Sequence, residues 1–169
     1  AVSVYDITGR TPEVVRTVQV GRTIQAMMCD DRMDEIVCIS KSGERLIRIP
    51  DNGQEATIDE PLPSAISFVG DPRLALNPET QEYYVGDTEA DSIFSVIPTP
   101  GSPRLQIGQG IQLGSLGGIK ALTGSDGGAL LMLLGDGSVR EAYRSPTNGQ
   151  WAFRSDTLFK GFEGSGDLQ

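Results

Sequence analysis

The sequence predicts an all-β chain built from a repeated antiparallel unit. Glycine occurs 21 times and proline 10 times, at short intervals along the 169 residues, as expected for many short strands joined by turns. Short apolar or alternating segments lie between these turns, and no long run with helical spacing occurs. A strand-turn-strand pattern also recurs three times. A hydrophobic content of 38% is sufficient for one ordinary core, so the chain is expected to form one repeat domain.

The first copy of the repeat is a three-stranded meander. Its strands are predicted at residues 23–29, 35–39 and 45–49, with a turn at residues 30–34. The second and third copies have the same order, and their turns carry the Asn, Asp and Gly residues that tight hairpins need. Their strands are predicted at 72–76, 82–85 and 92–97, and at 118–122, 129–134 and 138–143.

The copies repeat with the spacing of β-propeller blades. Their turns centre near residues 32, 79 and 126, which gives a period of about 47 residues, within the ~40–50 residues of four-stranded blades. A more polar fourth strand is predicted at 54–58, 104–107 and 150–154. Val2–Asp6 and Glu13–Gly21 are interpreted as the third and fourth strands of a preceding blade. The predicted organisation is a half blade at 1–21, blades at 22–58, 64–107 and 117–154, and a tail or further strand at 155–169.

The N-terminal strands carry a resemblance to a known family. Val2-Ser3-Val4-Tyr5-Asp6, followed by Val14-Val15-Arg16-Thr17-Val18-Gln19-Val20-Gly21, resembles the tandem repeat of YVTN-type (YncE-like) β-propellers. The resemblance extends over most of residues 2–97. The segment from Gln150 to Ser155, followed by Phe159 to Phe162, is similar to one that closes the propeller in some bacteriophage tail and DNA-stabilisation proteins. These resemblances imply a propeller fold and, for the second, a virion component.

Three and a half blades do not close a ring, because propellers generally contain about four blades or more. Open sheet edges expose unpaired backbone, which favours pairing with another chain. We therefore expect protein partners: the chain is a homo-oligomer or a part of a larger complex, and one arrangement is a seven-bladed ring of two chains. A net charge of −9 without a basic stripe argues against direct nucleic-acid binding. No apolar run approaches the ~18 residues of a membrane span.

The composition argues against an enzyme. The chain has no histidine, which removes the commonest general base and the usual His-containing metal sites. No catalytic residue and no cofactor are predicted. Asp87, Glu89 and Asp91 alternate as weak metal-ligand candidates, but Ser92 and Pro98 stand where an EF-type loop needs Gly and Glu, so a solvated loop is favoured.

Three other groups of residues have two interpretations each. The acidic residues Asp30, Asp31, Asp34 and Glu35 surround a predicted hairpin tip and are expected to be hydrated rather than to bind a cation. Cys29 and Cys38 flank the same turn, and two reduced thiols are favoured over a disulfide. The C-terminal aromatic residues are either a partner contact or the packing of the last strand. They are Trp151, Phe153, Phe159 and Phe162.

The sequence therefore predicts a non-enzymatic structural or interaction module, a rigid propeller platform within a larger assembly such as a virion tail or neck. The first alternative is a ligand-binding or sugar-binding propeller, which would repeat one pocket in every blade. The second is a metal-dependent propeller hydrolase or lactonase with carboxylates from different blades. The residues identify no compartment, although a soluble protein in a virion, outside the cell or in the periplasm fits the composition.

Overall fold

The computed structural model of the chain contains fifteen strands in four antiparallel sheets, and no helix among the residues it describes. The described residues are 1–31, 33–50, 58–64, 66–89, 92–98, 105–108, 110–112, 118–125, 127–154 and 158. The all-β prediction is confirmed. The regular alternation of apolar residues with Gly, Pro and Asn turns explains why short strands form and helices do not. No helix of the described chain is long and apolar enough to cross a membrane.

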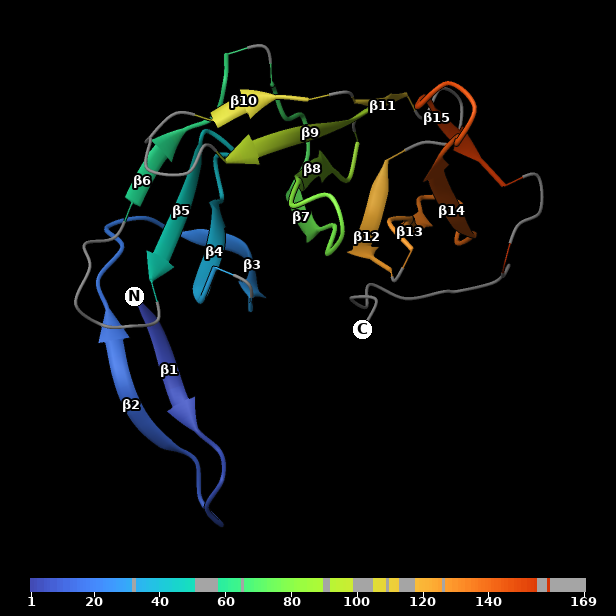
Figure 1. Ribbon diagram of the computed structural model, residues 1–169. Coiled ribbons are helices and arrows are strands. Elements are labelled where there is room, and N and C mark those ends of the chain that lie inside the picture. The colour runs from blue at the N-terminus through green and yellow to red at the C-terminus, as the bar shows by residue number, and fades with distance from the viewer. Residues whose placement is uncertain are drawn as a thin grey trace.

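Sheet 1 contains two strands, β1 (Val2–Asp6) and β2 (Glu13–Val18). They pair antiparallel from Val2 opposite Val18 to Asp6 opposite Glu13, with a bulge that leaves Val15 unpaired. Figure 1 shows this hairpin extending away from the other three sheets.

Sheets 2, 3 and 4 are four-stranded meanders in which each strand pairs with the next along the chain. Sheet 2 consists of β3 (Ile24–Asp30), β4 (Glu35–Ser40), β5 (Arg45–Pro50) and β6 (Ile58–Pro61). Sheet 3 consists of β7 (Pro72–Leu76), β8 (Tyr83–Asp87), β9 (Ser92–Pro98) and β10 (Leu105–Ile107), and a short strand β11 (Ile111–Gln112) also pairs with β9. Sheet 4 consists of β12 (Ile119–Gly124), β13 (Leu130–Leu134), β14 (Val139–Arg144) and β15 (Trp151–Phe153).

The first hairpin turn of each four-stranded sheet uses backbone conformations that the sequence favours. Asp34 and Gln81 adopt positive φ angles of 50° and 59°, and Gly127 and Gly128 adopt 87° and 74°. In sheet 3 the side-chain Oδ1 of Asn77 accepts hydrogen bonds from the backbone of the residues that follow it, which holds the turn closed.

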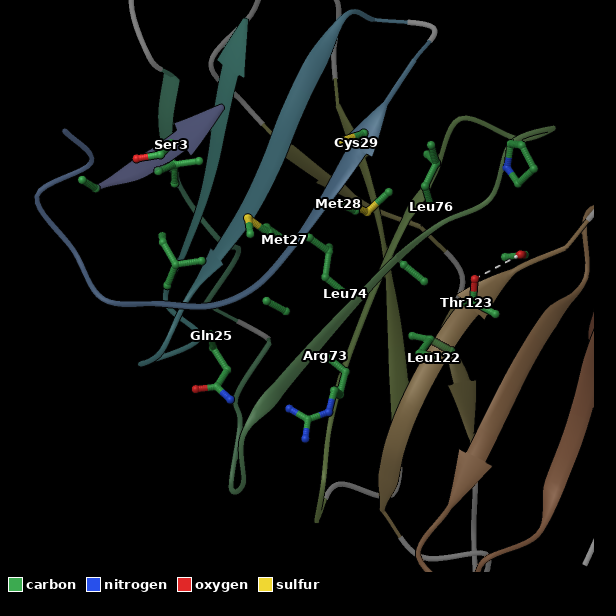
Figure 2. A pocket seen from close by; sticks show the side chains of 17 residues that line it. Ser3, Gln25, Met27, Met28, Cys29, Arg73, Leu74, Leu76, Leu122 and Thr123 are labelled. Atoms are coloured by element: carbon green, nitrogen blue, oxygen red, sulfur yellow. Dashed lines mark hydrogen bonds between the residues drawn. The ribbon is translucent and has the colours of Figure 1, made fainter. Parts of the chain in front are cut away.

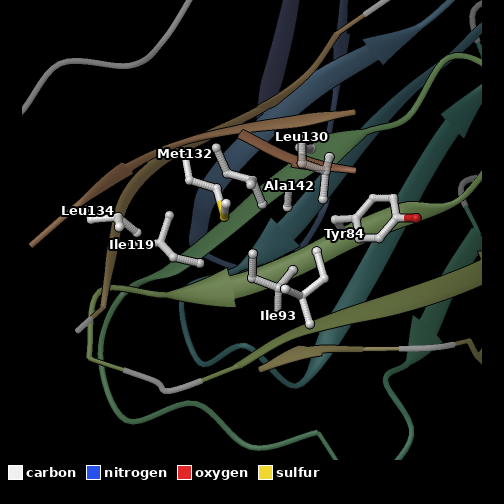
Figure 3. Close-up of a cluster of buried hydrophobic side chains, with 10 residues drawn as sticks. Tyr84, Ile93, Ile119, Leu130, Met132, Leu134 and Ala142 are labelled. Atoms are coloured by element: carbon white, nitrogen blue, oxygen red, sulfur yellow. The ribbon is translucent and has the colours of Figure 1, made fainter. Parts of the chain in front are cut away.

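The sheets pack face to face in chain order, with the first strands β3, β7 and β12 on the inside of the arch (Figure 1). The core between sheets 3 and 4 contains Tyr84 and Ile93 from sheet 3, and Leu130 and Met132 from sheet 4, all fully buried (Figure 3). Burial of each such side chain stabilises the fold by about 1.5–3 kcal/mol. A similar core joins sheets 2 and 3. A smaller core joins the base of sheet 1 to sheet 2 through Val2, Cys38, Ile47 and Ile49.

One predicted strand position needs correction. The fourth strand of the first full unit was predicted to end at residue 58, whereas β6 runs from Ile58 to Pro61. Asp59 and Glu60 look like turn residues in the sequence, but they form ion pairs with Arg45 and Arg48 on the adjacent strand β5. Residues 51–57 lie outside the described chain.

Glycines that precede β11 and β12 lie close to neighbouring backbone. Ile111 is buried in β11, and a Cβ at Gly110 would lie 2.9 Å from the carbonyl oxygen of Ile93. A Cβ at Gly118 would lie 1.8 Å from the carbonyl oxygen of Thr88. These glycines therefore permit close approach of two backbones.

Candidate interaction surface

The first strands of the sheets line an open groove of about 850 Å³ on the inside of the arch (Figure 2). Its walls come from β3, β7 and β12 and from the start of β1. The labelled side chains include Gln25, Met27, Cys29, Arg73 and Thr123. The groove is therefore formed mostly by one structural position repeated in three sheets.

Equivalent positions of the groove carry different side chains. Met27, Leu74 and Leu122 pair with Cys38, Val85 and Met132 in the neighbouring strand of their sheets, which makes them equivalent. Two residues further along the chain the series is Cys29, Leu76 and Gly124. The described groove lining contains no carboxylate and no aromatic side chain.

The hairpin of sheet 1 carries several exposed apolar side chains. Tyr5 and Val14 lie opposite each other across β1 and β2, and 53% and 55% of their surfaces are exposed. Ile7 and the bulged Val15 are also exposed. Exposed single apolar residues are ordinary, but four on one hairpin form a patch of the kind that partners cover.

A buried polar network lies between sheets 2 and 3, at a place where the sequence predicted hydrated acidic residues. Asp30 and Glu35 are buried, so that prediction is wrong for these two, whereas Asp31 and Asp34 are exposed as expected. The Tyr83 hydroxyl donates to Oδ2 of Asp30 at 3.0 Å. Burial and the Asp30 carboxylate together raise the pKa of Tyr83. The hairpin tip folds into the sheet interface because sheet 3 supplies this donor.

Sheet 2 also contains an ion-pair group that sequence analysis missed. Arg48 lies 3.6 Å from Oε2 of Glu35 and 3.3 Å from Oε2 of Glu60, and all three side chains are buried. Alternation along β5 places Arg48 on the face toward sheet 3. A basic residue inside an otherwise apolar strand was the available signal, because a buried Arg requires acidic partners.

A second network joins sheets 3 and 4 through Glu82. Its carboxylate accepts a hydrogen bond from the Tyr84 hydroxyl. It also accepts hydrogen bonds of 2.8–2.9 Å from the Ser95 hydroxyl and the Arg144 guanidinium. Burial and the hydrogen bond to Glu82 raise the pKa of Tyr84 to about 12. The Arg144 guanidinium also lies 5.3 Å from the ring centre of Trp151. Glu82 therefore has a structural role at this interface.

Of the three weak metal candidates, the structure describes Asp87 and Glu89. Asp87 is buried, and its two carboxylate oxygens accept hydrogen bonds of 2.7 Å from the backbone N–H groups of Val69 and Glu89. The Glu89 side chain is exposed, and Asp91 lies outside the described residues. In the described part of the chain, no group of three or more His, Cys, Asp or Glu residues could hold a metal ion.

The C-terminal aromatic residues that are described lie against the core. Trp151 and Phe153 are partly buried and pack on the cluster between sheets 3 and 4. The Trp151 and Tyr84 rings meet edge to face, with ring centres 5.5 Å apart. Phe159 and Phe162 lie outside the described residues, so a partner contact through this region stays a prediction.

Both cysteines are free thiols in the structure. Cys29 is exposed in the groove, whereas Cys38 is buried between sheets 1 and 2. Burial, with a smaller effect of Cys29, raises the pKa of Cys38 to about 11. The two thiols therefore differ strongly in access to solvent and in reactivity.

Comparison with known proteins identifies the fold. The structure matches the Cps50 (Swd1) β-propeller domain from Myceliophteria thermophila with a TM-score of 0.60 over 91% of this chain and 51% of that chain, at 17% identity. The chain has a β-propeller-type fold. It also matches virginiamycin B lyase from Staphylococcus aureus with a TM-score of 0.57 over 90% of this chain and 48% of that chain, at 14% identity. No family model matches the sequence, and no curated protein matches it.

The comparisons confirm the predicted propeller-type sheets. This chain spans about half the length of each of the two propeller chains that it matches. The groove lined by β3, β7 and β12 corresponds to the inside of a propeller, where the first strands of the blades meet. The described residues offer this groove apolar side chains, the hydroxyls of Ser3 and Thr123, one amide, one thiol and one guanidinium.

Proposed function

We propose that this chain is a non-enzymatic interaction module, a rigid propeller platform that acts within a larger protein assembly. The observation that carries the proposal is the exposed apolar face of sheet 1, where Tyr5 and Val14 lie side by side in a two-stranded sheet. The other three sheets have four or five strands each and bury the apolar residues of one or both faces. An apolar sheet face with open edges favours association with another protein.

The polar chemistry of the chain supports a structural role. Buried carboxylates at the sheet interfaces are engaged by local donors: Asp30 by Tyr83, and Glu82 by Arg144. Asp87 binds two backbone N–H groups. These groups hold the sheets in fixed positions. The described residues that line the groove include no acid-base pair. The lyase named in the comparison shares the fold at low identity, and fold alone carries no activity.

The virion version of this proposal rests on the resemblance of the segment from Gln150 to Phe162 to phage tail and DNA-stabilisation proteins. The YVTN-type resemblance of the N-terminal strands is compatible with the same platform role. A homo-oligomer and a hetero-complex are both forms of the assembly that we propose.

A sugar-binding propeller is the weaker candidate. It would repeat one polar and aromatic pocket in each sheet, whereas the equivalent groove positions are Met27, Leu74 and Leu122. A carboxylate-bound metal for hydrolysis would need acidic groups from several sheets in the groove, and its described lining has none.

Sedimentation velocity on a matched pair of variants tests the proposal. Val15→Lys places a charge on the exposed patch of sheet 1. Val69→Lys changes a similarly exposed valine in the connection between β6 and β7. We expect Val15→Lys to weaken association and Val69→Lys to leave it unchanged. Equal sedimentation of both variants and the parent chain would contradict a role for this patch in assembly.

A further inference from the structure

Equivalent residues in the first strands of the three complete sheets differ sharply in exposure. Met27 is 64% exposed, whereas Leu74 and Leu122 are 9% and 8% exposed. All three are large apolar side chains at the same register position. The difference therefore comes from what lies in front of each sheet.

Leu74 and Leu122 are covered by the inner strands of the preceding sheet. Leu74 packs in a cluster with Ala26, Met28 and Val37 from β3 and β4 of sheet 2. Leu122 packs in a cluster with Ala75 and Tyr84 from β7 and β8 of sheet 3. In both cases the covering residues come from the first and second strands.

Sheet 1 covers the outer part of the same face of sheet 2 and, on β3, the first residue Ile24. Val2 and Val18 pack on Cys38, Ile47 and Ile49, which belong to β4 and β5. Met27 and Cys29, on β3, stay exposed. Sheet 1 therefore occupies the place of the third and fourth strands of a preceding blade.

Among the described strands, one edge of β1 has no partner, because β1 pairs only with β2. Its first residues, Ala1 to Ser3, line the same groove as β3 (Figure 2). An unpaired strand edge accepts an added strand through main-chain hydrogen bonds.

We propose that the free edge of β1 together with Met27 and Cys29, here called the docking surface, binds a β-hairpin of the propeller-repeat type. The hairpin supplies the first two strands of a blade whose outer strands are β1 and β2. This inference rests on the proposed function and deepens it, because it states which surface makes the assembly contact and what kind of segment fits it.

The required hairpin has a defined chemistry. Its second strand runs antiparallel to β1, and small or apolar side chains from both strands face Met27, as Ala75 and Tyr84 face Leu122. The three described hairpins of this pattern, β3–β4, β7–β8 and β12–β13, already belong to complete sheets. The described strands of a second copy therefore do not supply it, and the occupant is a further hairpin of the same pattern.

A chimera tests this proposal. Residues 70–91, which contain β7 and β8, are duplicated in front of Ala1, so that the duplicate leads into β1 as the original leads into β9. Alternation then points the duplicated Ala75 and Tyr84 toward Met27. The matched control carries Ala75→Asp and Tyr84→Asp in the duplicate only.

The readout is the labelling rate of the Cys29 thiol by a soluble maleimide. We expect the duplicate to slow labelling by about tenfold or more relative to the parent chain, because covered groups react only through local opening. The control chimera should label at the parent rate. A chimera that is folded and labels as fast as the parent chain would overturn the proposal.

A second measurement covers the case in which the chimera does not fold. A synthetic peptide of residues 70–91 is added to the unmodified chain, and saturable protection of Cys29 is expected. The absence of protection at saturating peptide would also overturn the proposal. Neither result depends on self-association of the chain. A chain that stays monomeric but binds the hairpin would contradict the proposed assembly in solution and would still support the docking surface.

Discussion

The hydroxyl of Tyr83 in sheet 3 donates a 3.0 Å hydrogen bond to Oδ2 of Asp30 in sheet 2. Both groups are buried, and they are the point at which the polar hairpin tip of one blade meets the second strand of the next. Buried polar groups of this kind are costly to leave unpaired, so the bond fixes the relative position of two sheets as well as satisfying a carboxylate.

Tyr83→Phe should therefore destabilise the fold. Loss of the donor leaves a buried carboxylate with one partner fewer, which costs about 1–3 kcal/mol. Urea unfolding followed by tryptophan fluorescence measures the free energy of unfolding. Tyr143→Phe, in sheet 4, is the matched control, because no hydrogen bond of its hydroxyl occurs among the described residues. Equal stability of the two variants would show that the Tyr83 bond contributes nothing.

Arg144, at the end of β14, and Arg154, directly after β15, should contribute differently to the free energy of unfolding. Arg144 binds the largely buried Glu82 and packs on Trp151, so Arg144→Ala should cost about 1.5–3 kcal/mol. Arg154 binds Glu141 from a largely exposed position, so Arg154→Ala should cost less than about 1 kcal/mol. Thermal unfolding of the two variants measures the difference, and an equal loss would contradict the structural role of Glu82.

Stability should fall at alkaline pH. Burial raises the pKa of Cys38 to about 11 and that of Tyr84 to about 12, and it also raises the pKa of Tyr83. The folded state therefore holds these protons more tightly than the unfolded chain. Their contribution to the free energy of unfolding is complete below the pKa values of the unfolded chain, near 9 for Cys38 and 10 for the tyrosines. It is lost as the pH rises toward the pKa values of the folded state.

The expected slope is about 1.4 kcal/mol per pH unit for each group that is protonated only in the folded state. Unfolding in urea between about pH 8 and 12 measures it. Tyr84→Phe should reduce the slope above about pH 10. A free energy of unfolding that stays constant through this range would contradict the burial of these groups.

The two thiols should react at very different rates. Cys29 is exposed, whereas Cys38 is buried and its pKa is raised, so only Cys29 has access to the reagent. Mass spectrometry after brief labelling of the native chain should show one modification, on Cys29, and a second only in denaturant. Rapid labelling of Cys38 in the native chain would contradict the packing of sheet 1 on sheet 2.

The repeat itself could be predicted from the sequence, because apolar alternation and turn residues are local signals. The turns near Arg32, Glu79 and Asp126 and the alternating residues around Met27, Leu74 and Leu122 were sufficient to place the first two strands of each sheet. The fourth strands were harder to predict from the sequence. In β6, the residues Asp59 and Glu60 look like a turn until their arginine partners on β5 are known.

The polar interfaces could not be predicted, because burial of a charge depends on the neighbouring sheet. Asp30 and Glu35 look like solvated turn residues in sequence, and only the approach of Tyr83 and Arg48 makes them interior groups. Glu82, which directly precedes β8 in sheet 3, was a usable signal. An acidic residue recurring at one register position of two units suggests a shared structural role.

The mass of the native particle in solution tests the central claim most directly. The unmodified chain has a mass of 18.1 kDa. Native mass spectrometry, supported by light scattering across a range of concentrations, is predicted to show a dimer, a larger ring or a complex with partner chains. A stable, concentration-independent monomer of 18.1 kDa would contradict the account of this chain as an assembly module.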